Sequence, residues 1–252
     1  MQENLSLFDF DEQQEAVLMP GHDGPFQFHA KAIFPFLSDS DILQFVTTHN
    51  GKQIGIFETI TKTFPVYECL YQNELLTVAQ APLGAPAATQ FLDFLIYFGV
   101  RQVISVGSCG VLVDIPENKF LVSTVALRDE GTSFHYAPKS DFIKLNQSVI
   151  STIEQSLKEH HLNFHEVQTW TTDGFFRETP KVIQKRKAQG CEVVEMECAA
   201  LAACAQFRKV DFGQIFFTAD SLANLKAYNE RSWGAQSQEK GLTLAAELVQ
   251  AL

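Results

Sequence analysis

The chain has 252 residues and a net charge of −11, with 19 Lys and Arg against 30 Asp and Glu. This charge argues against nucleic acid or an anionic membrane as the partner, because both are bound through basic patches. No linker, repeat or low-complexity stretch divides the sequence, so we expect a single domain over residues 1–252.

Short apolar runs alternate with segments of helical periodicity, which is typical of an α/β domain. Nine strands are predicted, over residues 16–19, 53–57, 66–70, 75–80, 102–106, 120–127, 167–171, 192–194 and 214–219. Several of these runs are apolar on both faces, so helices should cover both sides of the sheet. The expected fold is a single α/β domain with a mixed central β-sheet flanked by helices.

Four helices are predicted between and after these strands. Over residues 87–98, apolar side chains recur at helical spacing and Gly99 follows as a stop signal. The other three helices span residues 141–160, 197–207 and 239–252. The helix over 197–207 is rich in Ala, so it can lie close to the sheet.

The termini, cysteines and histidines bear on location and cofactors. Residues 1–4 are polar and acidic, unlike a secretory signal, and no apolar run reaches the roughly 20 residues of a membrane span. The five cysteines lack CxxC spacing, as expected for buried free thiols in a reducing compartment; they are Cys69, Cys109, Cys191, Cys198 and Cys204. The histidines show no ligand spacing. We therefore expect a cytoplasmic protein without a metal.

The first of three polar strand ends is Gly107-Ser108-Cys109-Gly110, after the strand over 102–106. Two glycines would allow a sharp turn whose N–H groups face an anion, and Ser108 adds a hydroxyl donor. A plain structural turn is the alternative interpretation. The pattern does not match GxGxxG, because position 113 is Val, so no dinucleotide site is predicted.

The second strand end is Glu195-Met196-Glu197. If the strand alternation continues, Glu195 and Glu197 point to the same side. Buried acids need hydrogen-bond donors, which sugar hydroxyls can supply, and Met196 would form an apolar wall beside them. The alternative is the first turn of a helix, where the macrodipole favours Glu.

The third strand end is Asp220, which follows the apolar run over 214–219. Asp220 either caps the following turn or is a functional acid, and the pattern alone leaves both open. Ligands in open α/β folds bind beyond the carboxyl ends of strands, and all three motifs lie at such ends.

Taken together, these motifs resemble the nucleoside phosphorylase family, which includes hexameric purine nucleoside phosphorylases, uridine phosphorylases and methylthioadenosine nucleosidases. The likeness covers about residues 15–250 and is carried by ordered segments at 19–21, 84–86, 106–110, 128–133, 172–175, 194–197 and 218–221. It implies the fold of that family and a homo-oligomer, either a dimer or a hexamer. It also implies no cofactor, with inorganic phosphate as the co-substrate.

The resemblance implies roles for the residues on the sugar and base side. Met196 and Glu197 would hold the ribose, and Glu195 would line the same pocket. Phe175 would stack on the base, where an aromatic face contributes roughly 1–3 kcal/mol. The transition state resembles an oxocarbenium ion, so carboxylates near the sugar suit its developing positive charge.

The resemblance also implies an acid and a phosphate site. Asp220 matches the acid that protonates or hydrogen-bonds N7 of a purine, and Arg231 is the nearest candidate to assist it. Ser108, the backbone near Gly21 and Lys62 would contact phosphate, Lys62 across a subunit interface. The implied reaction is phosphorolysis of a nucleoside to a free base and ribose 1-phosphate.

The base preference rests on two features. Asp220 occupies the purine-type position, and the Gln-x-Arg pair by which uridine phosphorylases read uracil does not follow Phe175. A purine nucleoside is therefore the expected substrate. Arg177 and Glu178 beside it leave a uracil reader open.

The sequence departs from the family at the phosphate site. His22-Asp23-Gly24 stands where family members have an arginine after Pro-Gly, and Ser105 stands where another precedes the glycines. Each charge-assisted contact contributes about 1.5–3 kcal/mol, so losing two lowers phosphate affinity by roughly 10²–10⁴-fold. Other cations that could compensate are Lys31, Lys62 and Arg128.

This departure keeps two alternatives open. One is a hydrolytic nucleosidase, in which water replaces phosphate and Asp23 is a candidate for orienting it. The other is a non-catalytic relative that binds a nucleoside through an altered phosphate site.

Overall fold

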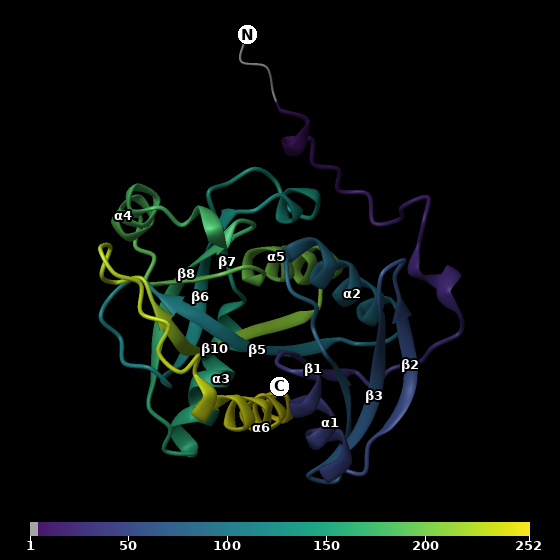
Figure 1. The fold of residues 1–252 in the computed structure, drawn as a ribbon. Coiled ribbons are helices and arrows are strands. Elements are labelled where there is room, and N and C mark those ends of the chain that lie inside the picture. The colour runs from purple at the N-terminus through teal and green to yellow at the C-terminus, as the bar shows by residue number, and fades with distance from the viewer. Residues whose placement is uncertain (1–4) are drawn as a thin grey trace.

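The strand that carries Gly107 and Ser108 lies at the centre of a ten-stranded mixed sheet in the computed structural model, which describes residues 5–252 (Figure 1). The strands are β1 (Lys31–Phe36), β2 (Lys52–Glu58), β3 (Thr63–Tyr71), β4 (Glu74–Ala79), β5 (Gln102–Val111), β6 (Phe120–Asp129), β7 (Phe142–Lys144), β8 (Phe164–Thr172), β9 (Val193–Glu195) and β10 (Asp211–Ser221). The predicted fold class, one α/β domain with a mixed sheet, is confirmed.

The pairing of β5 determines the architecture. On one side β5 pairs in parallel with β1, and β4, β3 and β2 continue the sheet from there. On the other side it pairs in parallel with β10 as far as Val111, and beyond β1 on the first side the end of β5 pairs with β9 in antiparallel fashion. Because β10, β6, β8 and β9 also pair in sequence, these four strands and β5 close a ring. The sequence analysis did not predict this ring.

Six α-helices are present in the described residues: α1 (Asp39–Thr48), α2 (Ala85–Tyr97), α3 (Gln147–Glu159), α4 (Pro180–Ala188), α5 (Cys198–Arg208) and α6 (Gln238–Ala251). Figure 1 shows α2 and α5 on one side of the central strands and α1, α3 and α6 on the other. Helices thus cover both faces, as the apolar strands predict. None of the described helices is long and apolar enough to cross a bilayer.

Two predicted elements are corrected by the structure. Residues 16–19 form no strand, and Val17 and Leu18 are exposed, so this apolar run does not belong to the sheet. The predicted helix over 141–160 is helical only as α3, because its first residues form the short strand β7. The Asn146 side chain accepts the backbone N–H of Ser148 and begins the helix.

Three elements besides β7 were not predicted. Strand β1 contains Pro35, which weakens its strand signal. Helix α1 begins at a capping box, in which Ser38 and Asp41 each accept a backbone N–H from the other. Helix α4 begins at Thr179 and has a single buried residue, Ile183, so its apolar periodicity is weak.

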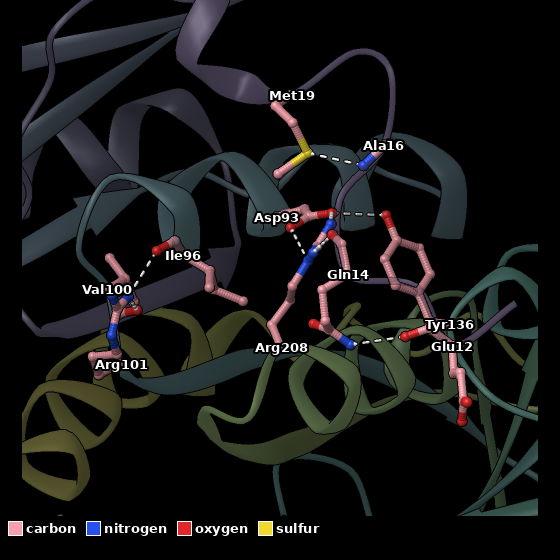
Figure 2. A network of polar contacts seen from close by, with 10 residues as sticks. All are labelled: Glu12, Gln14, Ala16, Met19, Asp93, Ile96, Val100, Arg101, Tyr136 and Arg208. Carbon is pink, nitrogen blue, oxygen red and sulfur yellow. Dashed lines mark hydrogen bonds and ion pairs between the residues drawn. The ribbon is translucent and has the colours of Figure 1, made fainter.

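The segment before β1 is attached to the domain through Arg208 at the end of α5. Its guanidinium donates two hydrogen bonds to Asp93 on α2, at 2.8 and 2.9 Å, and one to the carbonyl of Gln14 at 2.6 Å (Figure 2). The hydroxyl of Tyr136 donates to the same Asp93 at 3.1 Å. Both charged side chains are largely buried, so this network connects α2, α5 and the N-terminal segment.

The cysteines lie in the interior as expected. All five are free and buried. Burial raises the pKa of the Cys109, Cys198 and Cys204 thiols well above the ordinary value. They therefore stay protonated and unreactive. The expectation drawn from residues 1–4 lies outside the described part of the chain.

Candidate active site

A cavity of about 890 Å³ opens where β5, β9 and β10 end. Of the nine predicted site residues, the structure brings six to its lining: Ser108, Phe175, Glu195, Met196, Glu197 and Asp220. They come from four separate segments of the chain. Their convergence follows from the ring, which brings the carboxyl ends of β5 and β10 together.

The run Gly107-Ser108-Cys109-Gly110 forms no turn. These residues continue strand β5, with Gly107 paired to Phe216 and Cys109 to Thr218. The two glycines instead permit close approach, since a Cβ on Gly107 would lie 3.0 Å from the Cβ of Phe36. The Ser108 side chain is exposed to the cavity, where it is available to a ligand.

Asp220 lies in an irregularity of β10. Between Thr218, which pairs with Cys109, and Ser221, which pairs with Val111, strand β10 has one residue more than β5. An extra residue of this kind is a β-bulge, which changes the direction of a side chain. The bulge directs Asp220 to the cavity, while Ala219 is buried.

Burial raises the pKa of the Asp220 carboxyl above its ordinary value. A hydrogen bond from the Tyr228 hydroxyl and the positive charge of Arg231 oppose this rise. Arg231 does not line the cavity, because its guanidinium donates to the carbonyls of Ala219 at 3.3 Å and Ile115 at 2.8 Å. Arg231 thus binds the backbone of the bulge at Ala219, and its positive charge lowers the pKa of Asp220.

Both carboxylate oxygens of Glu195 accept hydrogen bonds from neighbouring residues of the protein. One carboxylate oxygen accepts the hydroxyls of Thr169 at 3.1 Å and Thr171 at 2.6 Å. The other accepts the backbone N–H groups of Glu197 at 2.8 Å and Cys198 at 2.7 Å, at the start of α5. The helix-start interpretation therefore describes Glu195. The expected strand alternation is wrong, because β9 ends at Glu195 and Glu197 is the residue before α5.

Glu197 has fewer partners. Its Oε1 accepts the backbone N–H of Gly84, the residue before α2, at 2.5 Å. Burial, followed by the charge of Glu195, raises the pKa of Glu197 to about 8. The backbone N–H of Met196 also acts on this carboxyl and lowers its pKa, and the Glu197 side chain lines the cavity, where a ligand hydroxyl can contact it.

Glu178 is a cavity residue to which the sequence analysis assigned no catalytic role. It follows the short helical turn η4 (Phe175–Arg177) and lines the same cavity as Asp220. Burial, followed by the charge of Asp220, raises the pKa of Glu178 to about 7. Tyr228 and Trp233 also line the cavity and were not predicted. All three lie in polar segments without periodicity, so only the position of Glu178 soon after Phe175 could have indicated it.

Gly21 does not reach the cavity. A Cβ on Gly21 would lie 2.5 Å from the hydroxyl of Tyr97, the last residue of α2. Glu197 contacts Gly84, at the opposite end of that helix. A helix of 13 residues is roughly 20 Å long, so Gly21 is remote from Glu197. Asp23 likewise lies outside the cavity.

Lys62 lines a smaller neighbouring cavity of about 400 Å³, which shares Ser108 and Trp233 with the first. Its Nζ lies 4.0 Å from Asp39. The two other cations considered for an anion are engaged elsewhere. Lys31 binds Glu74 and a backbone carbonyl near the C-terminus, and Arg128 bonds to the loop at residues 133–140.

The cavity lining is one-sided in charge. Four carboxyl side chains line it, and no Lys, Arg or His does so among residues 5–252: the acids are Glu178, Glu195, Glu197 and Asp220. The described residues also contain no cluster of three or more His, Cys, Asp or Glu side chains that could hold a metal ion. The arrangement suits a ligand that offers hydroxyl, amino or developing positive groups, and it disfavours an anion.

Comparison with known proteins places these features in a family. A model described as the phosphorylase superfamily matches residues 36–252. A DeoD-type purine nucleoside phosphorylase of Buchnera aphidicola subsp. Acyrthosiphon pisum is 24% identical over 222 residues, which are 85% of each chain.

Solved structures show the same fold. A purine nucleoside phosphorylase of Toxoplasma gondii in complex with immucillin-H superimposes with a TM-score of 0.74 at 16% identity, over 90% of this chain and 91% of that one. An AMP nucleosidase of Bacteroides thetaiotaomicron gives a TM-score of 0.70 at 19% identity, over 87% of this chain and 86% of that one.

Proposed function

Because the chain belongs to the phosphorylase superfamily, we propose that it cleaves the N-glycosidic bond of a purine nucleoside and that water is the attacking nucleophile. One observation carries this proposal. Four carboxyls and no cation line the cavity within the described residues. A phosphate dianion would find no positive charge in this lining to offset the loss of its hydration, whereas a neutral nucleoside and water need none.

The acids of the cavity match the needs of this reaction. Asp220 lies at the bulge of β10, where burial raises its pKa above the ordinary value, and this shift favours its role as an acid toward the leaving base. General acid catalysis of this kind contributes about 10²–10⁴-fold. Glu197 binds the ribose hydroxyls from the cavity lining, and Met196 lies against the sugar. Carboxyl oxygens beside the sugar suit the positive charge that develops on the ribose.

The base is held at the other end of the cavity. The Phe175 side chain is about half exposed, and its ring lies 4.1 Å from that of Phe176, so an aromatic face is available at the cavity mouth. Stacking on such a face contributes roughly 1–3 kcal/mol for a nucleobase. Purine nucleosides are favoured because Asp220 can contact N7, and the relative from Buchnera is a purine nucleoside phosphorylase.

Base release in the presence and absence of phosphate tests the proposal. The purified protein is incubated with adenosine, inosine, methylthioadenosine or uridine, and free base and sugar product are measured. Hydrolysis predicts equal rates with and without phosphate, with ribose as the product. Release that requires phosphate and yields ribose 1-phosphate would contradict water as the nucleophile. No release from any nucleoside, together with binding, would indicate a non-catalytic relative.

Phosphorolysis is the second candidate, because the cavity that contains Lys62 joins the main one at Ser108. A phosphate beside Ser108 would lie near this cation, and a partner subunit in a homo-oligomer could add another. In that case Lys62→Met should raise the KM for phosphate by about tenfold or more, since a charge-assisted contact contributes about 1.5–3 kcal/mol. An unchanged phosphate KM in this variant would count against the candidate.

A further inference from the structure

The loop that carries Phe175 depends on its two ends for its position. This base loop spans residues 173–179, between the end of β8 and the start of α4. Among the described hydrogen bonds, those of residues 174–178 all stay between positions 172 and 179. The Phe175 side chain is about half exposed and that of Phe176 is almost fully exposed. The middle of the base loop therefore has little to fix it other than its ends.

Both ends of the base loop are bound by residues at the end of β6. At the first end, the Asp173 carboxylate accepts the backbone N–H of Gly131 at 3.0 Å. At the second end the loop continues into α4, where Nη2 of Arg186 donates to Oδ2 of Asp129 at 2.6 Å. Asp129 and Gly131 are two positions apart, so one short segment binds the chain on both sides of Phe175.

Helix α4 connects Arg186 to the base loop. The Thr179 side chain accepts the backbone N–H of Val182, which joins the end of the loop to the first turn of the helix. Ile183 is the one buried residue of α4. Ile183 and Arg186 are three positions apart and lie on the same face of the helix. The ion pair is therefore one of the few contacts that determine where α4 and the loop before it lie.

A buried tryptophan orients the carboxylate of this ion pair. Nε1 of Trp170 donates to the same Oδ2 of Asp129 at 2.9 Å, and the Arg186 guanidinium lies 5.5 Å from the centre of the Trp170 ring. Nη1 of Arg186 donates to Gln189 at 3.0 Å, whereas its Nε has no partner among the described residues. A largely buried and incompletely paired guanidinium is a weak source of net stability. Its well-defined geometry points instead to a role in positioning.

We propose that Arg186 and Asp129 are positioning residues that place Phe175 for stacking on the base of the substrate. This inference rests on the proposed function, in which the base stacks on Phe175. Neither Arg186 nor Asp129 lines the cavity, so both act through α4 and the base loop. Stacking contributes equally to the bound nucleoside and to its transition state, so its loss raises KM and leaves kcat nearly unchanged.

Steady-state kinetics of Arg186→Met test this role. Methionine keeps an apolar side chain beside Trp170 and removes the charge and the donors. KM for the nucleoside should rise about fivefold or more with kcat within about twofold, because base stacking on an aromatic face contributes roughly 5- to 150-fold in affinity. Arg186→Lys keeps the charge and should recover part of the loss. The matched control is Lys185→Met, which removes an exposed charge from the same helix and should leave KM unchanged.

A double-mutant cycle with Phe175→Ala distinguishes positioning from a general loss of stability. If Arg186 acts through Phe175, then Phe175→Ala raises KM much less in the Arg186→Met protein than in the wild type. A loss of folded protein alone would lower the apparent kcat at an unchanged KM. A wild-type KM in Arg186→Met, or an equal effect of Phe175→Ala in both proteins, overturns the proposal.

Hydrogen exchange of the free protein separates this inference from the proposed function. The backbone N–H groups of Arg177 and Thr179 donate within the base loop. Exchange over residues 174–179 should be faster in Arg186→Met than in the wild type and in Lys185→Met, because the loop opens more often. If no nucleoside is cleaved by the wild type, the proposed function fails and exchange decides on the positioning: faster exchange in Arg186→Met supports it, and unchanged exchange overturns it.

Discussion

A Cβ on Gly110 would lie 3.1 Å from the Oδ1 of Asp220 and 2.9 Å from the Cδ1 of Leu222. The backbone of β5 and the carboxylate from the β10 bulge therefore approach each other as closely as two strands permit. A methyl group at position 110 requires the side chain of Leu222 to move and Asp220 to shift by a few tenths of an ångström.

Gly110→Ala should therefore displace the acid while leaving the fold intact. We expect kcat/KM for the nucleoside to fall, but by less than the roughly 10²-fold that a misplacement of about 1 Å causes. Steady-state kinetics measure the loss. Gly131→Ala is the matched control, because its Cβ would meet only Leu7 at 3.8 Å. Wild-type kinetics in Gly110→Ala would show that Asp220 has room to move without consequence.

Asp220→Asn keeps the size of the side chain and removes its proton. Purine cleavage should lose about 10²–10⁴-fold in kcat, because the leaving base is no longer protonated. Sugar binding should change little, since Glu197 and Met196 are untouched. Single-turnover rates and ribose binding are measured side by side. A variant with nearly full activity would remove Asp220 from the acid role.

The raised pKa of Glu197 predicts how stability depends on pH. With a folded pKa of about 8 against an ordinary value of 4.5, the folded state retains a proton that the unfolded state releases. The unfolding free energy should therefore fall as pH rises from about 4.5 to 8. Across this window the titration of Glu197 lowers the unfolding free energy by on the order of 5 kcal/mol.

Glu197→Gln tests this directly, because the amide keeps the acceptor for the Gly84 N–H and does not titrate. Urea unfolding at several pH values should show a flatter dependence than that of the wild type. The raised pKa of Glu178 affects the pH dependence of the unfolding free energy equally in the wild type and the variant. The difference between their two pH dependences therefore reports Glu197. Parallel curves for the two proteins would contradict the prediction.

The Arg208–Asp93 ion pair should contribute to stability as a unit. The two side chains are 16% and 14% exposed, so removing one leaves the other partly buried and unpaired. Asp93→Ala should cost about 2–3 kcal/mol, and the double variant with Arg208→Ala should cost less than the sum of the single changes. Denaturant titrations of the four proteins in the cycle provide the coupling energy. Additive costs would show that the pair in Figure 2 is not coupled.

Helices and strands whose apolar residues recur at regular spacing were predicted from the sequence. The helix over 87–98 corresponds to α2 within two residues, and the strand over 120–127 corresponds to β6. Elements with a weak local signal were missed, such as α4 with its single buried residue. The ring could not be predicted, because the pairing of β5 with β10 joins residues far apart in the chain, and no local pattern encodes that register.

The site was predictable where its residues end strands. Glu195 and Asp220 were identified in this way, although the Glu195 carboxylate is occupied by α5 and the direction of Asp220 depends on a bulge. Glu178 and Tyr228 come from loops, and only the folded chain brings them to the cavity. Gly21 was carried over from a resemblance, and its segment instead lies at the far end of α2.

The position of β5 between β1 and β10 also has a consequence for biosynthesis. Its partner β1 precedes it in the chain, but Gly107 pairs with Phe216, which a ribosome adds about 110 residues later. At 5–20 residues per second, one edge of β5 waits roughly 5–20 s for its partner. An unpaired apolar edge is a template for association between nascent chains. Until β10 is synthesised, the unpaired edge of β5 is a binding site for a chaperone.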